Sequence, residues 1–323
     1  MKPATTTAYS RLRGRRGSAL LGVIWLSLAL TAIAFTLSRT VRGELDRASI
    51  NVDAARAYFL AKGGIERARL RMTRTQTGDR GDPNFGFRLG QRWMRFDFPE
   101  GNVVVEIIGE GGKLNVNQAS GEALARVLTS SGLDPAYSAA TAIRIVTARK
   151  PTQEQLLDPA GAAGSSLSRR PASFRELEEL LVLPGMTSDV LFGTWGRDRA
   201  GQWSKIGGLH RHLSVVGGGG VDANYASPEV LRAAGLGPGA IASLLEIREL
   251  RPLRSQDLEP NLMADQSGLI PVTAGSGGAY YTLWSRASLH GGRARRSVGA
   301  LVARTRPRSG HPIRVVRWYD AEF

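Results

Sequence analysis

The sequence predicts an α+β fold, in which a long N-terminal helix packs on an antiparallel sheet and an all-helical region of two similar units is inserted into that sheet. Three observations predict it. An uncharged apolar segment near the N-terminus continues into a helical pattern without proline, strand-like segments occur early and late in the chain, and a twelve-residue motif occurs twice between them. A chain of 323 residues is long enough for two domains, or for one domain with an insertion.

The composition excludes several classes of protein. The chain has no cysteine, so it contains neither disulfides nor cysteine-bound zinc. A hydrophobic content of 42% is typical of a globular body, and an aromatic content of 7% argues against an aromatic-rich binding surface. The net charge of +15 suits nucleic acid or an anionic membrane as a partner, but residues 1–17 alone carry five of the positive charges. The rest of the chain therefore carries +10, from 38 basic and 28 acidic residues.

Residues 18–38 form the predicted membrane segment. None of these 21 residues is charged, and a helix of this length spans about 31 Å, which matches the hydrocarbon core of a bilayer. The basic leader before the segment predicts a cytoplasmic N-terminus, with the bulk of the chain on the other side. A cleavable secretory signal is the alternative, because Ala32-Ile33-Ala34 offers a small-x-small cleavage site. The apolar stretch continues beyond that site through Phe35 and Leu37, which favours the membrane helix.

The helix is predicted to continue from the membrane segment to about Arg74, because no proline occurs between Val41 and Arg74. Two apolar stripes with three- and four-residue spacing follow this part of the chain, namely Leu45, Ala48, Val52, Ala55 and Phe59, and Tyr58, Ile65, Ala68 and Met72. The carboxyl half of the helix should pack on the protein's own body. The amino half has nothing of its own to cover it, so we expect helices of partner subunits on the candidate assembly residues Leu21, Trp25, Leu28, Leu45, Val52 and Phe59.

The strands of the predicted sheet come from both ends of the body. Residues 103–108 have the composition of a strand, and the alternating polar and aromatic residues of 91–98 suit its hairpin partner. Residues 279–289, 297–304 and 312–319 predict three further strands, separated by Gly- and Arg-rich turns. We expect these three strands to complete the sheet that the first two begin.

The middle of the chain contains a repeat. The motif of residues 113–124, KLNVNQASGEAL, recurs 107 residues later at 220–231 as GVDANYASPEVL. In each copy a serine, Ser120 or Ser227, is placed to cap the first helix, and a glutamate two residues later favours the helix dipole. A tight turn and a second helix follow in each copy. Between the copies, residues 174–186 are expected to form a further helix that ends in a Pro-Gly turn.

The two ends of the long helix carry a specific resemblance. Residues 15–21, RRGSALL, begin the apolar segment, and residues 56–66, RAYFLAKGGIE, follow in the second half of the helix. This arrangement resembles the type IV pilin-like proteins, and more closely the minor pseudopilin K family of the type II secretion system (general secretion pathway protein K). The resemblance implies that a prepilin peptidase cleaves the chain between Gly17 and Ser18 and that Ser18, the new N-terminus, is methylated.

Gly22 departs from the general pilin pattern. Most members of the superfamily carry glutamate as the fifth residue of the mature chain, where this chain has Gly22, and the absence of that glutamate is itself characteristic of the K family. The glutamate is held to offset the charged N-terminus of a neighbouring subunit within lipid. The first subunit of a fibre has no earlier neighbour, so Gly22 is expected to mark the tip position. The alternative is that a small residue here allows close helix packing.

The K family also has this order of elements: a long helix with strands, two SAM-like helical units, and closing strands. Residues 235–248 of the second copy add a likeness to the helix-hairpin-helix motif. The resemblance therefore implies six segments: a basic prepilin leader (1–17), the transmembrane part of the helix (18–38), the rod helix with the first strands of the pilin-like domain (39–112), the first inserted helical unit (113–216), the second helical unit (217–271) and the closing strands (272–323).

The sequence gives little support for bound ions, and we expect neither an enzyme nor a cofactor. Two acidic pairs are candidates for calcium ligands, Asp79 with Asp82 and Asp257 with Glu259, but helix caps or solvated loops explain them. Many K family members carry an acidic-aromatic block where this chain has IVTARKP at 145–151, so a calcium site carried over from the family is not supported.

Two histidines are the remaining metal candidates. His210 and His212 would share one face of an extended segment, but no third ligand lies nearby in the sequence. We expect both to be solvent-exposed loop residues.

These observations lead to a functional hypothesis. The resemblance implies a non-enzymatic minor pseudopilin, held in the bacterial inner membrane by a single pass with its C-terminal bulk in the periplasm. It would lie at the tip of the pseudopilus and initiate assembly for protein export across the outer membrane. The implied partners are the minor pseudopilins I and J, and then other pseudopilins. A bulky helical insertion fits only where no subunit stacks above it, which independently favours the tip.

The alternative is a membrane-tethered helix-hairpin-helix DNA-binding protein of an uptake system. Its support is the charge of +10 and the turn at 235–240, whose free amides at a helix start would hold a phosphate. Against it, residues 241–246 contain no Lys or Arg, and the next basic residue is Arg248. We therefore expect no nucleic acid partner.

Overall fold

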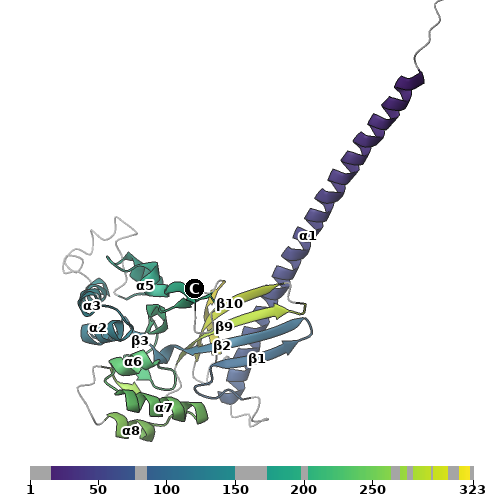
Figure 1. Ribbon diagram of the computed structural model, residues 1–323. Coiled ribbons are helices and arrows are strands. Elements are labelled where there is room, and N and C mark those ends of the chain that lie inside the picture. The colour runs from purple at the N-terminus through teal and green to yellow at the C-terminus, as the bar shows by residue number, and fades with distance from the viewer. Residues whose placement is uncertain are drawn as a thin grey trace, which may run out of the picture. The chain divides into compact units, whose positions relative to one another are not determined.

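The computed structural model has the predicted α+β architecture, with a long N-terminal helix packed on a five-stranded antiparallel sheet (Figure 1). The chain divides into two compact units, Met1–Arg56 and Ala57–Phe323, and the helix α1 (Arg16–Gln76) contributes to both. The structure describes residues 16–76, 86–149, 173–197, 203–262, 270–274, 279–291, 294–304 and 313–320.

In the first unit, α1 is an exposed apolar helix. The predicted continuation of the membrane segment into one long helix is confirmed, because α1 runs for 61 residues without a break. All side chains of residues 19–52 are exposed. By length and composition, α1 is long and apolar enough to cross a membrane.

In the second unit, the predicted strands all form and pair as one sheet. The order is β1-β2-β9-β10-β11 and every neighbouring pair is antiparallel. The strands are β1 (Trp93–Phe98), β2 (Gly101–Gly109), β9 (Tyr280–Leu289), β10 (Arg295–Arg304) and β11 (Ile313–Tyr319). The three closing strands therefore complete the sheet that the first hairpin begins.

The carboxyl part of α1 packs on one face of this sheet. In the second predicted stripe, Ile65, Ala68 and Met72 are buried and Tyr58 is half-buried. Alternate residues of β2 pack in the same core, because successive side chains of a strand point to opposite faces. These residues are Val103, Val105 and Ile107.

Gly64 lies where the helix and the sheet approach most closely. A Cβ atom at this position would lie 2.4 Å from Cγ1 of Val103 and 2.7 Å from Oγ of Ser285. The missing side chain therefore sets the distance between α1 and strands β2 and β9. Beside this contact, the guanidinium of Arg67 covers the Phe96 ring at 5.3 Å.

The inserted region occupies the chain between β2 and β9, which are neighbours in the sheet. It has its own hydrophobic core, separate from the core between α1 and the sheet. The region thus leaves the end of one strand and returns to the adjacent strand, so the sheet is intact around it.

Both copies of the repeat have the same local structure. Their helices are α2 (Gly121–Ser130) and α3 (Pro135–Arg149), and α6 (Pro228–Ala233) and α7 (Pro238–Leu250). The predicted serine caps are confirmed, because Ser120 Oγ accepts from the Ala123 amide and Ser227 Oγ accepts from the Val230 amide. These caps satisfy helix amides that lack an intrahelical partner.

The equivalence extends beyond the twelve-residue motif. The side chain of Asn117 bonds both the amide and the carbonyl of Phe174, and Asn224 bonds the same two groups of Leu253. Each asparagine thereby ties its copy to a third segment of chain. Each copy also has, in the last turn of its second helix, an arginine that donates to an equivalent carbonyl, Arg149 to Val116 and Arg248 to Ala223.

The inserted region differs from the all-helical prediction. It contains parallel pairs β3 (Leu114–Asn115) with β6 (Leu213–Ser214) and β7 (Val221–Asp222) with β8 (Val272–Thr273), and a hairpin of β4 (Thr194–Arg197) and β5 (Trp203–Ile206). Two-residue strands are too short for an alternating pattern to appear in sequence. Within 174–186 the predicted helix is a 3-10 helix, η4 (Leu177–Val182). The remaining helices are η2 (Glu110–Gly112), α5 (Ser188–Phe192), η5 (Leu209–Arg211) and α8 (Ser255–Leu262).

Candidate assembly surface and groove

The predicted processing residues lie in the first turns of α1. Gly17 and Ser18 are helical, and only their backbone is described. Among the described residues, and apart from the adjoining backbone of α1 itself, no atom lies within 4 Å of the place where a Cβ of Gly22 would stand. The chain itself therefore gives no packing reason for glycine at this position.

The predicted assembly residues are all exposed in the described part of the chain. Their exposed fractions lie between 50 and 72%, for Leu21, Trp25, Leu28, Leu45, Val52 and Phe59. Leu45, Val52 and Phe59 are seven residues apart, which is the spacing of helices that pack on one another as coiled coils. A stripe of exposed large apolar side chains is typical of a surface that a partner buries.

A buried carboxylate joins the inserted region to the sheet. Glu110 lies at the start of the insertion, where it pairs with Lys113 at 2.9 Å and accepts from the hydroxyls of Ser214 and Thr282 at 2.6 and 2.7 Å. Burial by itself would raise the pKa of Glu110, but the charge of Lys113 and the hydroxyl donors outweigh it and hold the pKa below its ordinary value. Glu110 is therefore ionised and fully bonded inside the protein.

Tyr225 makes a second contact at the same junction. Its ring meets the ring of Tyr281 edge-on, with centroids 5.7 Å apart, and its hydroxyl accepts from the Gly90 amide. Cβ atoms added at Gly109 or Gly112 would lie 2.3 Å from atoms of Tyr225. The second copy of the repeat is thus packed directly against the end of β2.

A groove of about 880 Å³ lies between the inserted region and the face of the sheet that is turned away from α1. Its lining includes six aromatic side chains, namely Trp93, Phe192, Trp195, Tyr225, Trp284 and Tyr319. The low aromatic content predicted no aromatic-rich binding surface, but the fold gathers these aromatic residues from distant segments into one groove. One feature of the sequence could have indicated this groove. Trp93 and Trp284 each lie next to a core residue in their strands, so they point to the face of the sheet that is turned away from α1.

The prediction that both histidines are exposed was wrong. His212 is only 8% exposed, and its Nδ1 lies 2.9 Å from Oγ of Ser227, the cap of α6. His210 is half-buried, with Nδ1 3.2 Å from the Leu191 carbonyl oxygen. The physical reason is that strand β6 begins directly after His212 and pairs with β3 inside the inserted region.

Acidification is expected to destabilise the protein through His212. Burial lowers the pKa of His212 below 6.5; Glu229 opposes this shift, and the charges of Arg211 and Lys113 support it. The unfolded chain then binds the proton at higher pH, so the stabilising effect is present above about pH 6.5 and is lost as the pH falls below it. We expect a lower urea midpoint at about pH 5.5 than at about pH 7.5, and a smaller difference in His212→Gln. Equal pH dependence in both proteins would contradict this.

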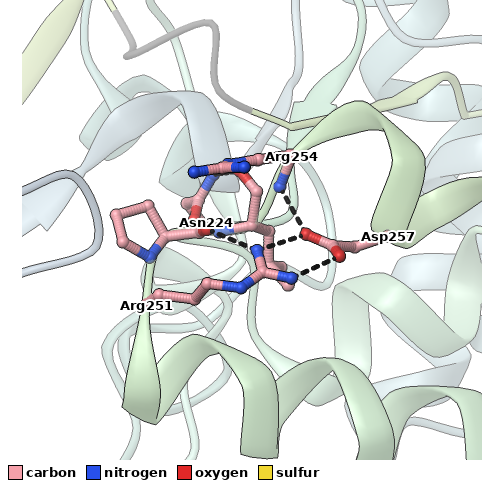
Figure 2. Close-up of polar contacts among 6 residues, drawn as sticks. Asn224, Arg251, Arg254 and Asp257 are labelled. Carbon is pink, nitrogen blue, oxygen red and sulfur yellow. Dashed lines mark hydrogen bonds and ion pairs between the residues drawn. The ribbon is translucent and has the colours of Figure 1, made fainter.

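Asp257 is a helix cap rather than a metal ligand. Figure 2 shows its carboxylate facing the Arg251 guanidinium, which donates two bonds of 2.7 Å, while the Arg254 amide donates a third. The bonds from Arg251 are the largest cause that lowers the pKa of Asp257 to about 2. Asp79 and Asp82 lie outside the described residues, as does the side chain of Glu259. Within the described part of the chain, no cluster of three His, Asp or Glu side chains is placed to hold a metal ion.

The structure also places the arginine on which the nucleic-acid alternative depends. The guanidinium of Arg248 donates to the carbonyls of Ala223 and Ala226. Burial is the largest cause that lowers the pKa of Arg248 to about 10. Arg248 is therefore used inside its own repeat and does not face a phosphate at the turn of Gly235, which has a φ of 94°.

Comparison with known proteins gives a likeness of fold. No protein-family model and no curated protein matches the sequence. Among solved structures, the chain is similar to one chain in the crystal structure of the GspK-GspI-GspJ complex from the type 2 secretion system of enterotoxigenic Escherichia coli. The TM-score is 0.51 at 14% sequence identity, over 88% of this chain and 99% of that chain. The protein therefore has a fold similar to that of a chain in that secretion complex.

Proposed function

We propose that this protein is a minor pseudopilin of the type II secretion system, of the K family, and that it lies at the tip of the periplasmic pseudopilus. The observation that carries the proposal is a helix-and-sheet body of the fold found in the GspK-GspI-GspJ complex, with a large region inserted between the neighbouring strands β2 and β9. That region holds the two copies of the repeat, which we assign to the SAM-like units 113–216 and 217–271. Such a bulk on a pilin-like body supports a place where no subunit stacks above it.

The apolar helix supports the rest of the proposal. Its uncharged segment 18–38 would anchor the protein in the inner membrane, with the C-terminal bulk in the periplasm. The exposed stripe of Leu45, Val52 and Phe59 would bind helices of the I and J minor pseudopilins. In this role the protein nucleates a fibre and performs no catalysis.

Processing at Gly17 gives the first test of the proposal. We expect mass spectrometry of the mature protein to find a chain that begins at Ser18 with one added methyl group. Gly17→Val should leave the leader attached and stop secretion, because a peptidase that recognises glycine has no room for a branched side chain. Gly14→Val, the same change within the leader, should be processed normally. A mature chain that begins at Phe35 would instead indicate a secretory signal and contradict the proposal.

Gly22 gives a test of the tip position. A glutamate here would lie in lipid without a positively charged neighbour, and an unpaired charge in that place is costly. We therefore expect Gly22→Glu to reduce secretion or leave it unchanged. We expect Gly22→Ala to be tolerated, since no described side chain or other segment lies within 4 Å of the added Cβ. If alanine impairs secretion as strongly as glutamate, close helix packing explains the glycine and the argument for the tip loses this support.

A further inference from the structure

The groove defined above has a floor of aromatic and arginine side chains. Arg286 lies 3.3 Å from the carboxylate of Glu106 and 5.9 Å from the ring of Trp93, and the Trp284 ring packs on Tyr319 with centroids 5.8 Å apart. These residues come from β1, β2, β9 and β11, which lie at opposite ends and in the centre of the sheet. At about 4.8 Å between strands the floor measures about 19 Å across, the length of an extended peptide of about six residues.

The inserted region forms the other wall of the groove. It contributes Arg175, Glu176, Trp195 and Arg211 among others, and Trp195 is 67% exposed. An ion pair of 2.6 Å between Glu176 and Arg317 joins this wall to the last strand. The groove is therefore bounded by the sheet on one side and by the inserted region on the other.

The charge of the groove is unbalanced. The carboxylates of Glu106, Glu110 and Glu176 pair with Arg286, Lys113 and Arg317. Two further lining arginines, Arg92 and Arg175, are exposed and have no ion-pair partner among the residues that the structure describes. Counted over all the described residues that line the groove, six basic side chains, including Lys113 and Arg211, face four glutamates, the fourth being Glu178. A ligand that carries carboxylates would meet complementary charge here.

We propose that this groove binds an extended, acidic segment of a partner protein, an activity that does not depend on the pseudopilin role. Tryptophan, tyrosine and arginine are the residues that carry most binding energy in protein interfaces, and the groove presents all three. The length of the groove suits an extended peptide. One set of alternate peptide side chains would pack on the aromatic floor, and the other set would face the arginines.

Fluorescence anisotropy on the full chain in detergent tests the proposal. The probe is a labelled octapeptide of alternating glutamate and leucine, compared with the same peptide carrying glutamine for glutamate. We expect the acidic peptide to bind at least about tenfold more tightly, and its affinity to fall as salt screens the arginines. Arg92→Glu combined with Arg175→Glu should raise the Kd at least about tenfold. Both side chains are exposed, and neither has an ion-pair partner within the described ranges, so the fold should be unaffected.

A matched pair of changes outside the groove provides the control. Arg295→Glu combined with Arg296→Glu changes the net charge of the protein by the same amount, at two exposed residues of β10 that do not line the groove. This double variant should change the Kd less than about twofold. Three results would overturn the proposal: equal Kd values for the two double variants, equal binding of the glutamate and glutamine peptides, or no binding of the acidic peptide to the wild type. If a single-stranded oligonucleotide binds more tightly than the acidic peptide, the assignment to a protein partner is overturned.

Discussion

Gly64→Ala is expected to destabilise the helix-and-sheet body by at least about 2 kcal/mol, although alanine favours helix formation by up to about 1 kcal/mol. The added Cβ would lie 2.4 Å from Cγ1 of Val103 and 2.7 Å from Oγ of Ser285. The Val103 methyl belongs to a stiff, β-branched side chain in the core, so α1 must move away from the sheet. The measurement is urea denaturation of the full chain in detergent.

The preceding residue supplies a matched control for this change. A Cβ at Gly63 would have one neighbour, Cε1 of Phe98 at 4.0 Å, so Gly63→Ala should stabilise the protein by up to about 1 kcal/mol. In the double variant Gly64→Ala with Val103→Ala, the removed methyl groups make room for the new one. We expect its destabilisation to be smaller than the sum of the two single changes. The same sign of effect at Gly63 and Gly64 would contradict the close approach of helix and sheet.

Glu110→Ala is expected to cost about 3–5 kcal/mol, the usual effect of breaking a buried ion pair from one side. The change leaves the ammonium group of Lys113 and the hydroxyls of Ser214 and Thr282 without their shared acceptor. Because the pKa of Glu110 is lowered in the folded protein, its stabilising effect is present above about pH 4.5 and is lost as the pH falls below that value. Urea denaturation above this pH measures the full effect.

An exposed ion pair in the same inserted region serves as the comparison. Glu122 pairs with Arg126 on the surface of α2, with side chains 60% and 38% exposed. Because solvent screens this pair, Glu122→Ala should cost no more than about 1 kcal/mol. Similar losses of stability for Glu110→Ala and Glu122→Ala would show that Glu110 does not hold the junction together.

The sequence predicted the long elements of the fold and the caps of its helices. The apolar spacing along α1 and the alternation in the five strand segments were sufficient to predict these elements. Each element is long enough to show the hydrophobic period of a helix or a strand. The caps at Ser120 and Ser227 were predicted from the repeat and formed as expected. The strands β3 and β7 were missed, since a strand of two residues has no period to detect.

The junction and the groove were not predictable, because they join residues that are distant in sequence. Glu110 meets Ser214 and Thr282, which are 104 and 172 residues away. A single glutamate between glycines gives no signal that it will be buried. His212 was expected to be exposed for the same reason, because its partner Ser227 belongs to the other copy of the repeat.

Native mass spectrometry of this chain co-expressed with the I and J minor pseudopilins of its own secretion system tests the proposed assembly. We expect one complex that contains one copy of each, and its loss in Leu45→Asp, which places a charge on the exposed stripe. Asn51→Asp, an exposed position of α1 outside the stripe, should leave the complex intact. If the I and J proteins associate while this chain stays apart from them, or if Leu45→Asp assembles as the wild type does, the account is contradicted.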